Sequence, residues 1–281
     1  MKIVAIIQAR MGSSRLPGKV LLNLPFNSGE PVLAQVVRRV KAAEQIQEVA
    51  LATTVAPADR AIAAWGHRSA LITVRGSEND VLERFYQTAR QTGADYIVRI
   101  TADCPCLDPS IIDAVVRDHF AQEADFTSSA IERTFPVGMD LSIFSAALLE
   151  EAHRQARADY EREHVTPYFY RSHPDRFKIN IFRAAGAFRR PGLRLTLDTV
   201  EDYHFLCSIF DHLYAEDPLF PLSRILELLE QKPWLRELNR GALQKKLYTS
   251  LPDELRDLLS YAEARGMSRA PSILKERLHS L

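Results

Sequence analysis

The chain has 281 residues, and its 36 lysines and arginines balance 36 aspartates and glutamates, so the formal net charge is zero. This balance excludes a bulk electrostatic attraction to nucleic acid, and without an apolar run of about 18 residues we expect no membrane-spanning helix. The three cysteines have neither metal-ligand spacing nor the pattern of a disulfide framework. We therefore expect a cytoplasmic protein with one large domain, or one domain and an appendage.

Short apolar, β-branched runs alternate with amphipathic segments from residue 1 to about 215. The predicted strands are the runs 3–7, 48–53, 71–74 and 96–101. Over residues 32–41 apolar side chains recur at helical spacing, with basic residues mostly on the opposite face. This alternation predicts βαβ units and a mainly parallel sheet, whose ligands bind beyond the carboxyl ends of the strands.

The pattern changes after residue 216. Asp217-Pro218-Leu219-Phe220-Pro221 interrupts it, and the remainder predicts short helices over 222–230, 251–265 and 272–278, with no strand between them. We therefore expect a main domain over residues 1–216 and a helical C-terminal extension over 217–281. The apolar faces of these helices have to be covered, either by the main domain or by a second chain.

A basic loop follows the first predicted strand. Residues 8–20, Gln-Ala-Arg-Met-Gly-Ser-Ser-Arg-Leu-Pro-Gly-Lys-Val, hold three cations and two glycines, and no acid occurs between residues 3 and 29. Cations and backbone N–H groups at the carboxyl end of a strand favour a polyphosphate ligand. Val20 follows Lys19, which excludes a Walker A loop, and the dinucleotide-binding fingerprint is also absent. The alternative is a solvated basic turn.

Two aspartates are candidate magnesium ligands. Asp103 follows the predicted strand 96–101, and Asp198 lies at the end of a late predicted strand, before the helix expected from Val200. A triphosphate carries about four negative charges, and phosphoryl transfer normally combines basic residues with Mg²⁺ held by carboxylate oxygens. Either aspartate could instead cap a helix, although the Cys-Pro after Asp103 makes capping less favourable there.

Four motifs, in this order, carry a family resemblance. They are residues 6–20, Thr-Ala-Asp-Cys-Pro at 101–105, Arg-Glu-His-Val-Thr at 162–166, and Leu-Thr-Leu-Asp-Thr-Val-Glu-Asp at 195–202. Over about residues 1–215 the chain resembles the cytidylyltransferases of the spore coat polysaccharide SpsF type, which are similar to the synthetases of CMP-activated Kdo and sialic acids. The resemblance implies a three-layer α/β/α nucleotide-diphosphosugar-transferase fold, Rossmann-like, with a mixed, mainly parallel seven-stranded sheet that has one antiparallel strand near the middle.

The resemblance also implies roles in nucleotide binding and catalysis. The loop residues that would cradle the β- and γ-phosphates are Arg10, Gly12, Ser13, Arg15 and Lys19. Lys19 and Arg15 would act as catalytic cations, and Asp103 and Asp198 as catalytic residues that hold Mg²⁺. The further nucleotide-binding positions are Gln8, Ala9, Ser14, Thr53, Thr54, Ser77, Arg84 and Thr101. Ala102 stands where the family usually has glycine, which adds a Cβ close to the nucleotide.

Two further segments resemble the family's acceptor-facing elements. Gly138 and Asp140 precede a predicted strand, and Arg162, Glu163 and His164 lie where a helix begins. Gly138 would permit a close approach, and Arg162 could pair with a sugar-acid carboxylate. Imidazole titrates near pH 6.5, so His164 is the candidate general base. The alternatives are a structural histidine and acidic residues that suit a helix N-terminus by its dipole.

Together these assignments predict an Mg²⁺-dependent cytidylyltransferase of surface polysaccharide or glycoconjugate biosynthesis. An acceptor oxygen would attack the α-phosphate of CTP and release pyrophosphate, and the default acceptor is an eight- or nine-carbon 2-keto sugar acid. A homodimer with no nucleic-acid or membrane partner is expected, because relatives commonly dimerise. The alternatives are a nucleotide-sugar glycosyltransferase of related fold, which would normally show Asp-x-Asp where Asp103-Cys104-Pro105 stands, and a non-catalytic nucleotide-binding protein.

Overall fold

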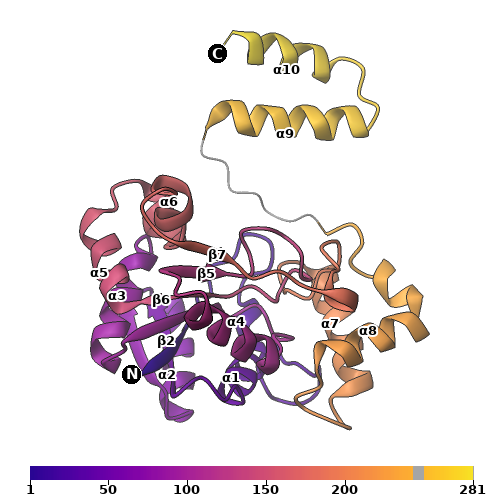
Figure 1. Ribbon diagram of the computed structural model, residues 1–281. Helices are drawn as coiled ribbons and strands as arrows, with labels where there is room; N and C mark the ends of the chain where they lie inside the picture. Colours follow the sequence, from indigo (N-terminus) through magenta and orange to yellow (C-terminus); the bar gives the residue numbers. More distant parts are fainter. Residues whose placement is uncertain (243–249, 281) are drawn as a thin grey trace. The chain divides into compact units, whose positions relative to one another are not determined.

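A seven-stranded sheet lies at the centre of the first part of the computed structural model, which describes residues 1–242 and 250–280 (Figure 1). In spatial order the strands are β3 (Ile72–Gly76), β2 (Glu48–Thr54), β1 (Ile3–Gln8), β4 (Tyr96–Thr101), β6 (Ser142–Ser145), β5 (Phe126–Ser128) and β7 (Ile179–Ile181). Strand β6 is antiparallel to both of its neighbours, and the other pairs are parallel. The predicted mixed sheet is therefore confirmed.

The central strands are buried on both faces. Residues 3–7 of β1 are at most 2% exposed, and their side chains alternate between two hydrophobic clusters, one on each side of the sheet. A nearly continuous apolar run is typical of a parallel strand that is covered on both faces. The sequence of β1 therefore accounts for its central position.

Helices cover both faces of the sheet and complete the predicted α/β/α layers. The larger cluster includes side chains of α1 (Val32–Lys41), α2 (Arg60–Arg68), α4 (Pro109–Ala121), α7 (Val200–Leu213) and α8 (Leu222–Gln231). The second cluster includes side chains of α3 (Val81–Thr92), α5 (Ala146–Gln155) and the π-helix η3 (Tyr168–Ser172). The remaining short helices of this part are η1 (Lys19–Leu21), η2 (Pro57–Asp59), α6 (Asp159–His164), η4 (Gly186–Phe188) and η5 (Pro233–Glu237).

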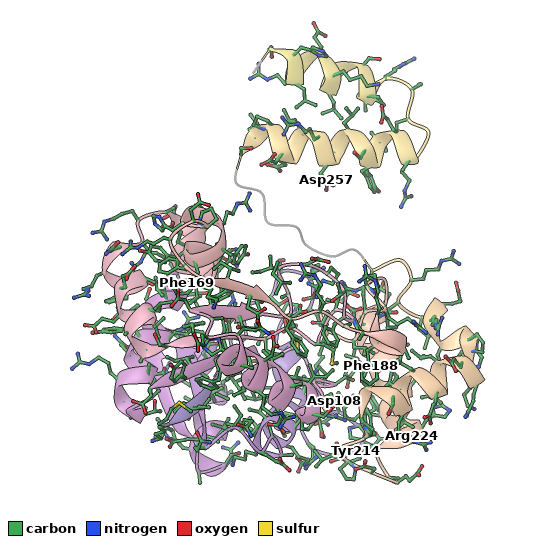
Figure 2. The ribbon with its side chains drawn as sticks, viewed as in Figure 1. Asp108, Phe169, Phe188, Tyr214, Arg224 and Asp257 are labelled. Atoms are coloured by element: carbon green, nitrogen blue, oxygen red, sulfur yellow. The ribbon has the colours of Figure 1, made fainter. Side chains whose placement is uncertain are left out.

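Helix α8 packs into the same unit as the sheet. Its N-terminal Leu222 N–H donates a 2.7 Å hydrogen bond to Asp108, which also caps α4 and is labelled in Figure 2. Its apolar face lies in the larger hydrophobic cluster and consists of Leu222, Ile225, Leu226, Leu228 and Leu229. The compact unit runs from Met1 to Ala242, and the domain boundary after residue 216 stays a prediction. The interruption at 217–221 is a turn that lets α8 return onto α7.

The second compact unit spans Leu243–Leu281, and its described part is a pair of helices. Helix α9 (Leu251–Ala264) packs against α10 (Ala270–His279), and the Lys275 ammonium lies 2.9 Å from a Glu263 carboxylate oxygen. Ala262 is buried between them, whereas Leu258 remains 49% exposed. Within residues 1–242 and 250–280, no helix has the length and apolar character needed to cross a membrane.

The carboxyl ends of β1, β2 and β4 meet at one edge of the sheet. Backbone hydrogen bonds continue past the strand ends, from Ala9 N–H to Ala52 at 3.0 Å and from Ala102 N–H to Gln8 at 3.0 Å. The basic loop after β1 therefore leaves the sheet between the segments that follow β2 and β4. This arrangement brings the sequence-distant candidate residues within reach of one another.

The packing of α8 predicts where the chain can be shortened. A chain ending at residue 242 should unfold cooperatively with the melting temperature of the first unit, because that unit is then intact. A chain ending at residue 216 should lose cooperative unfolding. Each buried leucine lost from a core costs about 2–5 kcal/mol, against a total stability of about 5–15 kcal/mol. Calorimetry on both chains checks this, and cooperative unfolding of the shorter chain would contradict it.

Candidate active site

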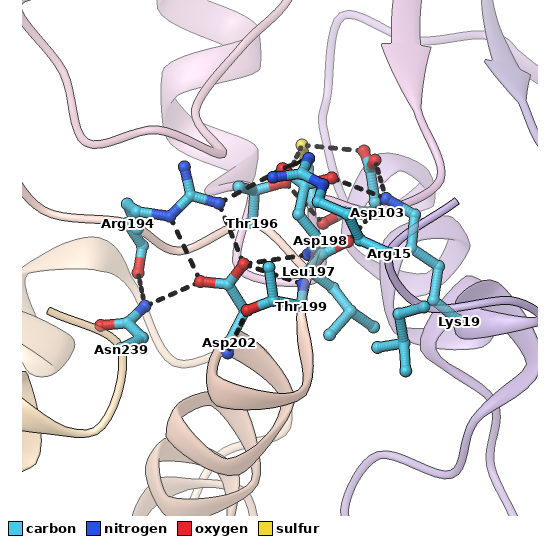
Figure 3. A network of polar contacts seen from close by, with 12 residues as sticks. Arg15, Lys19, Asp103, Arg194, Thr196, Leu197, Asp198, Thr199, Asp202 and Asn239 are labelled. Atoms are coloured by element: carbon cyan, nitrogen blue, oxygen red, sulfur yellow. Dashed lines mark hydrogen bonds and ion pairs between the residues drawn. The ribbon is translucent and has the colours of Figure 1, made fainter. Parts of the chain in front are cut away.

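Three charged side chains from distant parts of the sequence meet at the carboxyl edge of the sheet (Figure 3). Lys19 Nζ lies 2.7 Å from Asp103 Oδ2 and 2.8 Å from Asp198 Oδ1. It also donates a 2.7 Å hydrogen bond to the Leu197 carbonyl, and only 9% of the residue is exposed. Three of the predicted catalytic residues are therefore in direct contact.

Backbone hydrogen bonds fix the distance between the two aspartates. The Leu197 N–H donates to the Asp103 carbonyl at 2.8 Å, and the Thr196 hydroxyl donates to the same oxygen at 3.1 Å. The Asp103 backbone is thus joined directly to the segment that precedes Asp198. Either carboxylate can be displaced only if this backbone contact also moves.

The backbone at Gly138 packs against the segment that leads to Asp198. Its φ is +108°, and a Cβ on it would lie 2.7 Å from the carbonyl carbon and oxygen of Leu195. The adjacent Val137 accepts a 2.7 Å hydrogen bond from Leu195 N–H and donates one of 2.9 Å to Leu193. Glycine is required for this backbone approach. The close approach that Gly138 permits is therefore to this segment, and its predicted role toward the acceptor stays a prediction.

A fully buried aspartate, Asp202, binds the backbone at Asp198, and it was not among the predicted site residues. Asp202 Oδ2 accepts hydrogen bonds from Arg194 at 2.9 Å, from Asp198 N–H at 3.1 Å and from Thr199 N–H at 3.2 Å. Asn239 donates a 3.0 Å bond to Oδ1. The spacing of Thr199 and Asp202 is a capping box at the start of α7, and that pattern was the available signal.

The charges of the site shift the pKa values of its members. Burial raises the pKa of Asp198, but attraction and hydrogen bonds from Lys19, Arg15 and Arg194 outweigh burial and lower it overall. Burial lowers the pKa of Lys19, but Asp103 and Asp198 outweigh it and raise the pKa overall. Arg15 Nη2 lies 3.1 Å from Asp198 Oδ2. Lys19 and Asp198 therefore both remain charged at neutral pH.

A second missed aspartate anchors the basic loop. Asp59, 2% exposed, accepts a 2.6 Å hydrogen bond from the Met11 N–H and another from the Thr54 hydroxyl. Gly18, at φ +73°, donates a 2.9 Å bond to the Met11 carbonyl and closes the loop. In the sequence Asp59 only marked a helix start, and nothing there indicated a partner 48 residues away. The predicted nucleotide-binding residue Thr54 therefore donates its hydroxyl hydrogen bond to Asp59, the residue that anchors the loop.

The tip of the loop is open to solvent. Gly12 and Ser14 are exposed, and the Ser13 hydroxyl accepts a 3.3 Å hydrogen bond from Leu16 N–H. Exposed Arg10 has a guanidinium nitrogen 3.9 Å from a Glu163 carboxylate oxygen, which joins the loop to α6. Arg10 and Arg15 thus lie on the solvent side of the buried Lys19.

The remaining predicted nucleotide-binding residues lie around the loop, and three of their buried polar atoms have no hydrogen-bond partner in the described part of the chain. These atoms are Gln8 Oε1, Thr53 Oγ1 and Arg84 Nε. Arg84 is 2% exposed and donates to the carbonyls of Ser77 and Glu78. The Thr101 hydroxyl lies 3.3 Å from the Cys104 sulfur. Their roles toward a nucleotide stay predictions.

On the predicted acceptor side, Arg162 already has a carboxylate partner. Two of its N–H groups donate to Asp80 Oδ2, and Nη1 also donates to the carbonyls of His153 and Ala156. Asp80 caps the first turn of α3. The structure therefore places Arg162 as a link between α6 and α3.

His164 is the last residue of α6 and precedes a strained turn. Val165 has φ +67° and ψ −62°, and the Thr166 N–H donates a 2.7 Å hydrogen bond to the His164 carbonyl. This is a γ-turn with positive φ, which is rare, and for a β-branched residue such a conformation is a true outlier. Residues held this way cluster at functional sites. The fold thus fixes the position of His164, whose role as general base stays a prediction.

Asp140 lies close to the reaction edge but is paired within the protein. Arg133 Nη1 donates a hydrogen bond to its carboxylate. Burial raises the pKa of Asp140 above its ordinary value, although Arg133 opposes the shift. Its negative charge is therefore balanced before any ligand binds.

The donor set of the site suits a divalent cation bound together with phosphate. Within the described ranges, no three His, Cys, Asp or Glu side chains form a group that could hold a metal by themselves. Asp103 and Asp198 offer two carboxylates, and Mg²⁺ is typically held by one or two carboxylates plus substrate phosphates and water. With Lys19, Arg15 and Arg10 in the adjacent loop, the edge can bind a triphosphate and its cation.

Comparison with known proteins identifies the family. A family model described as cytidylyltransferase matches residues 4–247. The chain belongs to the cytidylyltransferase family. The spore coat polysaccharide biosynthesis protein SpsF of Bacillus subtilis is 35% identical over 233 residues, which are 82% of this chain and 95% of SpsF. A 3-deoxy-manno-octulosonate cytidylyltransferase of Geobacter sulfurreducens is 34% identical over 116 residues, 41% of this chain and 44% of that enzyme. The resemblance inferred from the four motifs is confirmed.

Solved structures share this cytidylyltransferase's fold. A cytidylyltransferase of Leptospira borgpetersenii has a TM-score of 0.77 and 31% identity, and the match covers 88% of this chain and 99% of that one. A CMP:2-keto-3-deoxy-manno-octonic acid synthetase complexed with CTP, at 0.55 and 17%, covers 75% and 99% and shows the fold alone. A Mycobacterium tuberculosis protein in complex with manganese, at 0.51 and 16%, covers 74% and 99% and also shows only the fold.

Removal of the buried support should destabilise the cytidylyltransferase. Asp202→Ala leaves Arg194 buried without its closest partner, and breaking a buried ion pair costs about 3–5 kcal/mol. We expect a loss of this size in the free energy of unfolding, measured by urea denaturation at pH 7. Asp211→Ala, on the exposed face of the same helix, is the matched control and should change stability by less than about 0.5 kcal/mol. Equal effects of the two substitutions would contradict the structural role of Asp202.

Proposed function

We propose that this nucleotidyltransferase transfers CMP from CTP to the hydroxyl of a sugar-acid acceptor and releases pyrophosphate. The observation that carries the proposal is the contact of Lys19, at the end of the basic loop, with the carboxylates of both Asp103 and Asp198. A cation between two carboxylates, beside two further cations, suits the charge that develops on a triphosphate during transfer. Membership of the cytidylyltransferase family supports cytosine as the base.

We propose Mg²⁺ as the cation, held by Asp103 and Asp198. When bound, Mg²⁺ would neutralise phosphate charge and orient the α-phosphate. Lys19 occupies the space between the two carboxylates, so it has to give up at least one of these contacts when a cation binds there. Its ammonium, which lies 2.7 and 2.8 Å from the two carboxylates in this structure, is then available to the triphosphate.

The chain's own residues position the substrates. Lys19, Arg15 and the loop N–H groups bind the β- and γ-phosphates and stabilise the negative charge on pyrophosphate as the bond from the α-phosphorus to the bridging oxygen breaks. The acceptor oxygen forms the new bond to the α-phosphorus, and His164 takes its proton. The γ-turn at Val165 fixes His164 in place for this transfer.

Three further parts of the proposal are the acceptor, the compartment and the assembly. The names of SpsF and of the 3-deoxy-manno-octulosonate enzyme support a 2-keto sugar acid used in surface polysaccharide or glycoconjugate synthesis. The free thiols of Cys104, Cys106 and Cys207 suit the reducing cytoplasm. Exposed apolar side chains on α9, such as Leu258, support a homodimer.

Loss of Asp103 should abolish transfer. Asp103→Ala removes a proposed metal ligand and a partner of Lys19, and the loss of one such contact lowers the rate about 10²-fold or more. Pyrophosphate release from CTP, Mg²⁺ and 3-deoxy-manno-octulosonate measures the effect. Asp175→Ala, at an exposed position, is the control and should keep full activity. Full activity of Asp103→Ala would contradict the proposed site.

Assembly is tested by light scattering of the full chain. A homodimer should scatter with twice the mass of a single chain, which is 31.8 kDa. The measurement is best repeated over a range of protein concentrations, because a weak dimer dissociates on dilution. A mass of 31.8 kDa at all concentrations would contradict the homodimer.

A further inference from the structure

Arg99 is a half-buried arginine beside the proposed reaction centre, and its Nε is buried. It lies in the middle of β4, level with Ile6 of β1 and Ser142 of β6. Side chains alternate along a strand, so Arg99 shares a face with Ile97, which belongs to the cluster covered by α3, α5 and η3. An arginine at this position faces the interior.

The guanidinium has no partner in the part of the chain that the structure describes. Its Nε is buried without a hydrogen bond, and no carboxylate oxygen lies within ion-pair distance of it there. Arg39 and Arg84 also have an unpaired Nε, but each donates another N–H to a backbone carbonyl, and Arg39 also stacks on Phe220. Those two arginines thus have a partner within the protein, whereas half-buried Arg99 makes no hydrogen bond to the described residues.

A buried N–H without a hydrogen-bond partner is unfavourable, so the unpaired Nε of Arg99 requires a reason. Burial lowers the pKa of Arg99, while Tyr170, Asp103 and Asp140 act against that shift. Arginine nevertheless stays protonated in proteins. A bound anion can supply the missing hydrogen bond at Nε and pair with the charge.

The neighbours of Arg99 indicate which ligand brings that anion. Asp140, which precedes β6, belongs to the predicted acceptor side, and Tyr170 lies in η3, which follows α6. Asp103 marks the reaction centre. The triphosphate has its own cations in the loop after β1. Arg162, the residue first expected to bind a carboxylate, is paired with Asp80. The acceptor side is therefore left with one unpaired cation among its described residues, Arg99.

We infer that Arg99 binds an oxyanion of the acceptor, a carboxylate or a phosphate, through the fork of its guanidinium. The inference rests on the proposed transfer of CMP, and it adds the residue that selects an anionic acceptor. A planar fork matches either oxyanion with two parallel N–H···O bonds, which fixes orientation as well as charge. Fixing the anion at Arg99 orients the rest of the acceptor toward the edge where Asp103 lies.

Binding of defined probes to the full chain tests this. Calorimetric titrations in the presence of CTP and Mg²⁺ use 3-deoxy-manno-octulosonate as the carboxylate, glucose 6-phosphate as the phosphate, and glucose as the neutral control. The wild type should bind one of the two anionic probes more tightly than glucose. Arg99→Met should lose about tenfold or more of that affinity, and Arg99→Lys should recover part of it. Arg68→Met, at an exposed position, is the matched control and should bind as the wild type does.

A second measurement separates ligand binding from a structural role. If the protein does not satisfy Arg99, the ligand-free Arg99→Met variant should melt at or above the wild-type temperature, since an apolar side chain removes an unpaired buried charge. A structural arginine would instead lower the melting temperature when removed.

Three outcomes would overturn the inference: equal anion affinity of the wild type and Arg99→Met, a wild type that prefers neither anionic probe, or a clearly lower melting temperature of Arg99→Met. Failure of the proposed function is seen separately, because CTP with Mg²⁺ would then not raise the melting temperature of the wild type. Arg99→Met should keep the CTP-induced rise, so a defect in nucleotide binding is distinguished from a defect in acceptor binding.

Discussion

The attraction between the Lys19 ammonium and the carboxylates of Asp103 and Asp198 is the interaction on which the site depends. Two carboxylates brought together in a partly buried place repel one another, and one of them would otherwise take up a proton. Lys19 prevents this and keeps Asp198 charged, as its lowered pKa indicates. The protein thereby keeps the two proposed metal ligands in place, and Lys19 is the side chain that has to move when a cation binds between them.

This interaction needs a rigid backbone, and two features of the chain supply it. Gly138 lets its own segment approach Leu195 so closely that any Cβ would collide. Asp202 binds two backbone N–H groups just ahead of α7 and neutralises Arg194. Both act on the short segment that carries Asp198, one from each side. The position of a single carboxylate is therefore set by backbone contacts, and charge alone does not determine it.

The sequence was sufficient for β1 to β4 and for the position of Asp103, because parallel strands bring their carboxyl ends to one edge whatever the rest of the fold does. The late strand expected before Asp198 was wrong, since that segment has only an isolated bridge between Arg194 and Val137. It was not sufficient for contacts that depend on three-dimensional packing. The apolar face of α8 indicated that something must cover it, but not that the sheet-bearing unit would. Lys19 was assigned to phosphate by its place in the loop, and its contact with both aspartates spans 84 and 179 residues. Asp59 gave no local signal of its partner, and Arg99 gave none of its unpaired Nε.

The distribution of arginines shows how stability and function conflict in this fold. Arg162 and Arg194 are paired with carboxylates, and Arg39 with a carbonyl and an aromatic ring, so each is satisfied by the protein itself. Such residues hold elements together and have little left to offer a ligand. A residue that is to bind a substrate anion has to remain unsatisfied until the substrate arrives, which lowers the stability of the free protein. Arg99 meets that condition, and the surrounding apolar cluster and central strand hold it in place despite the unfavourable burial.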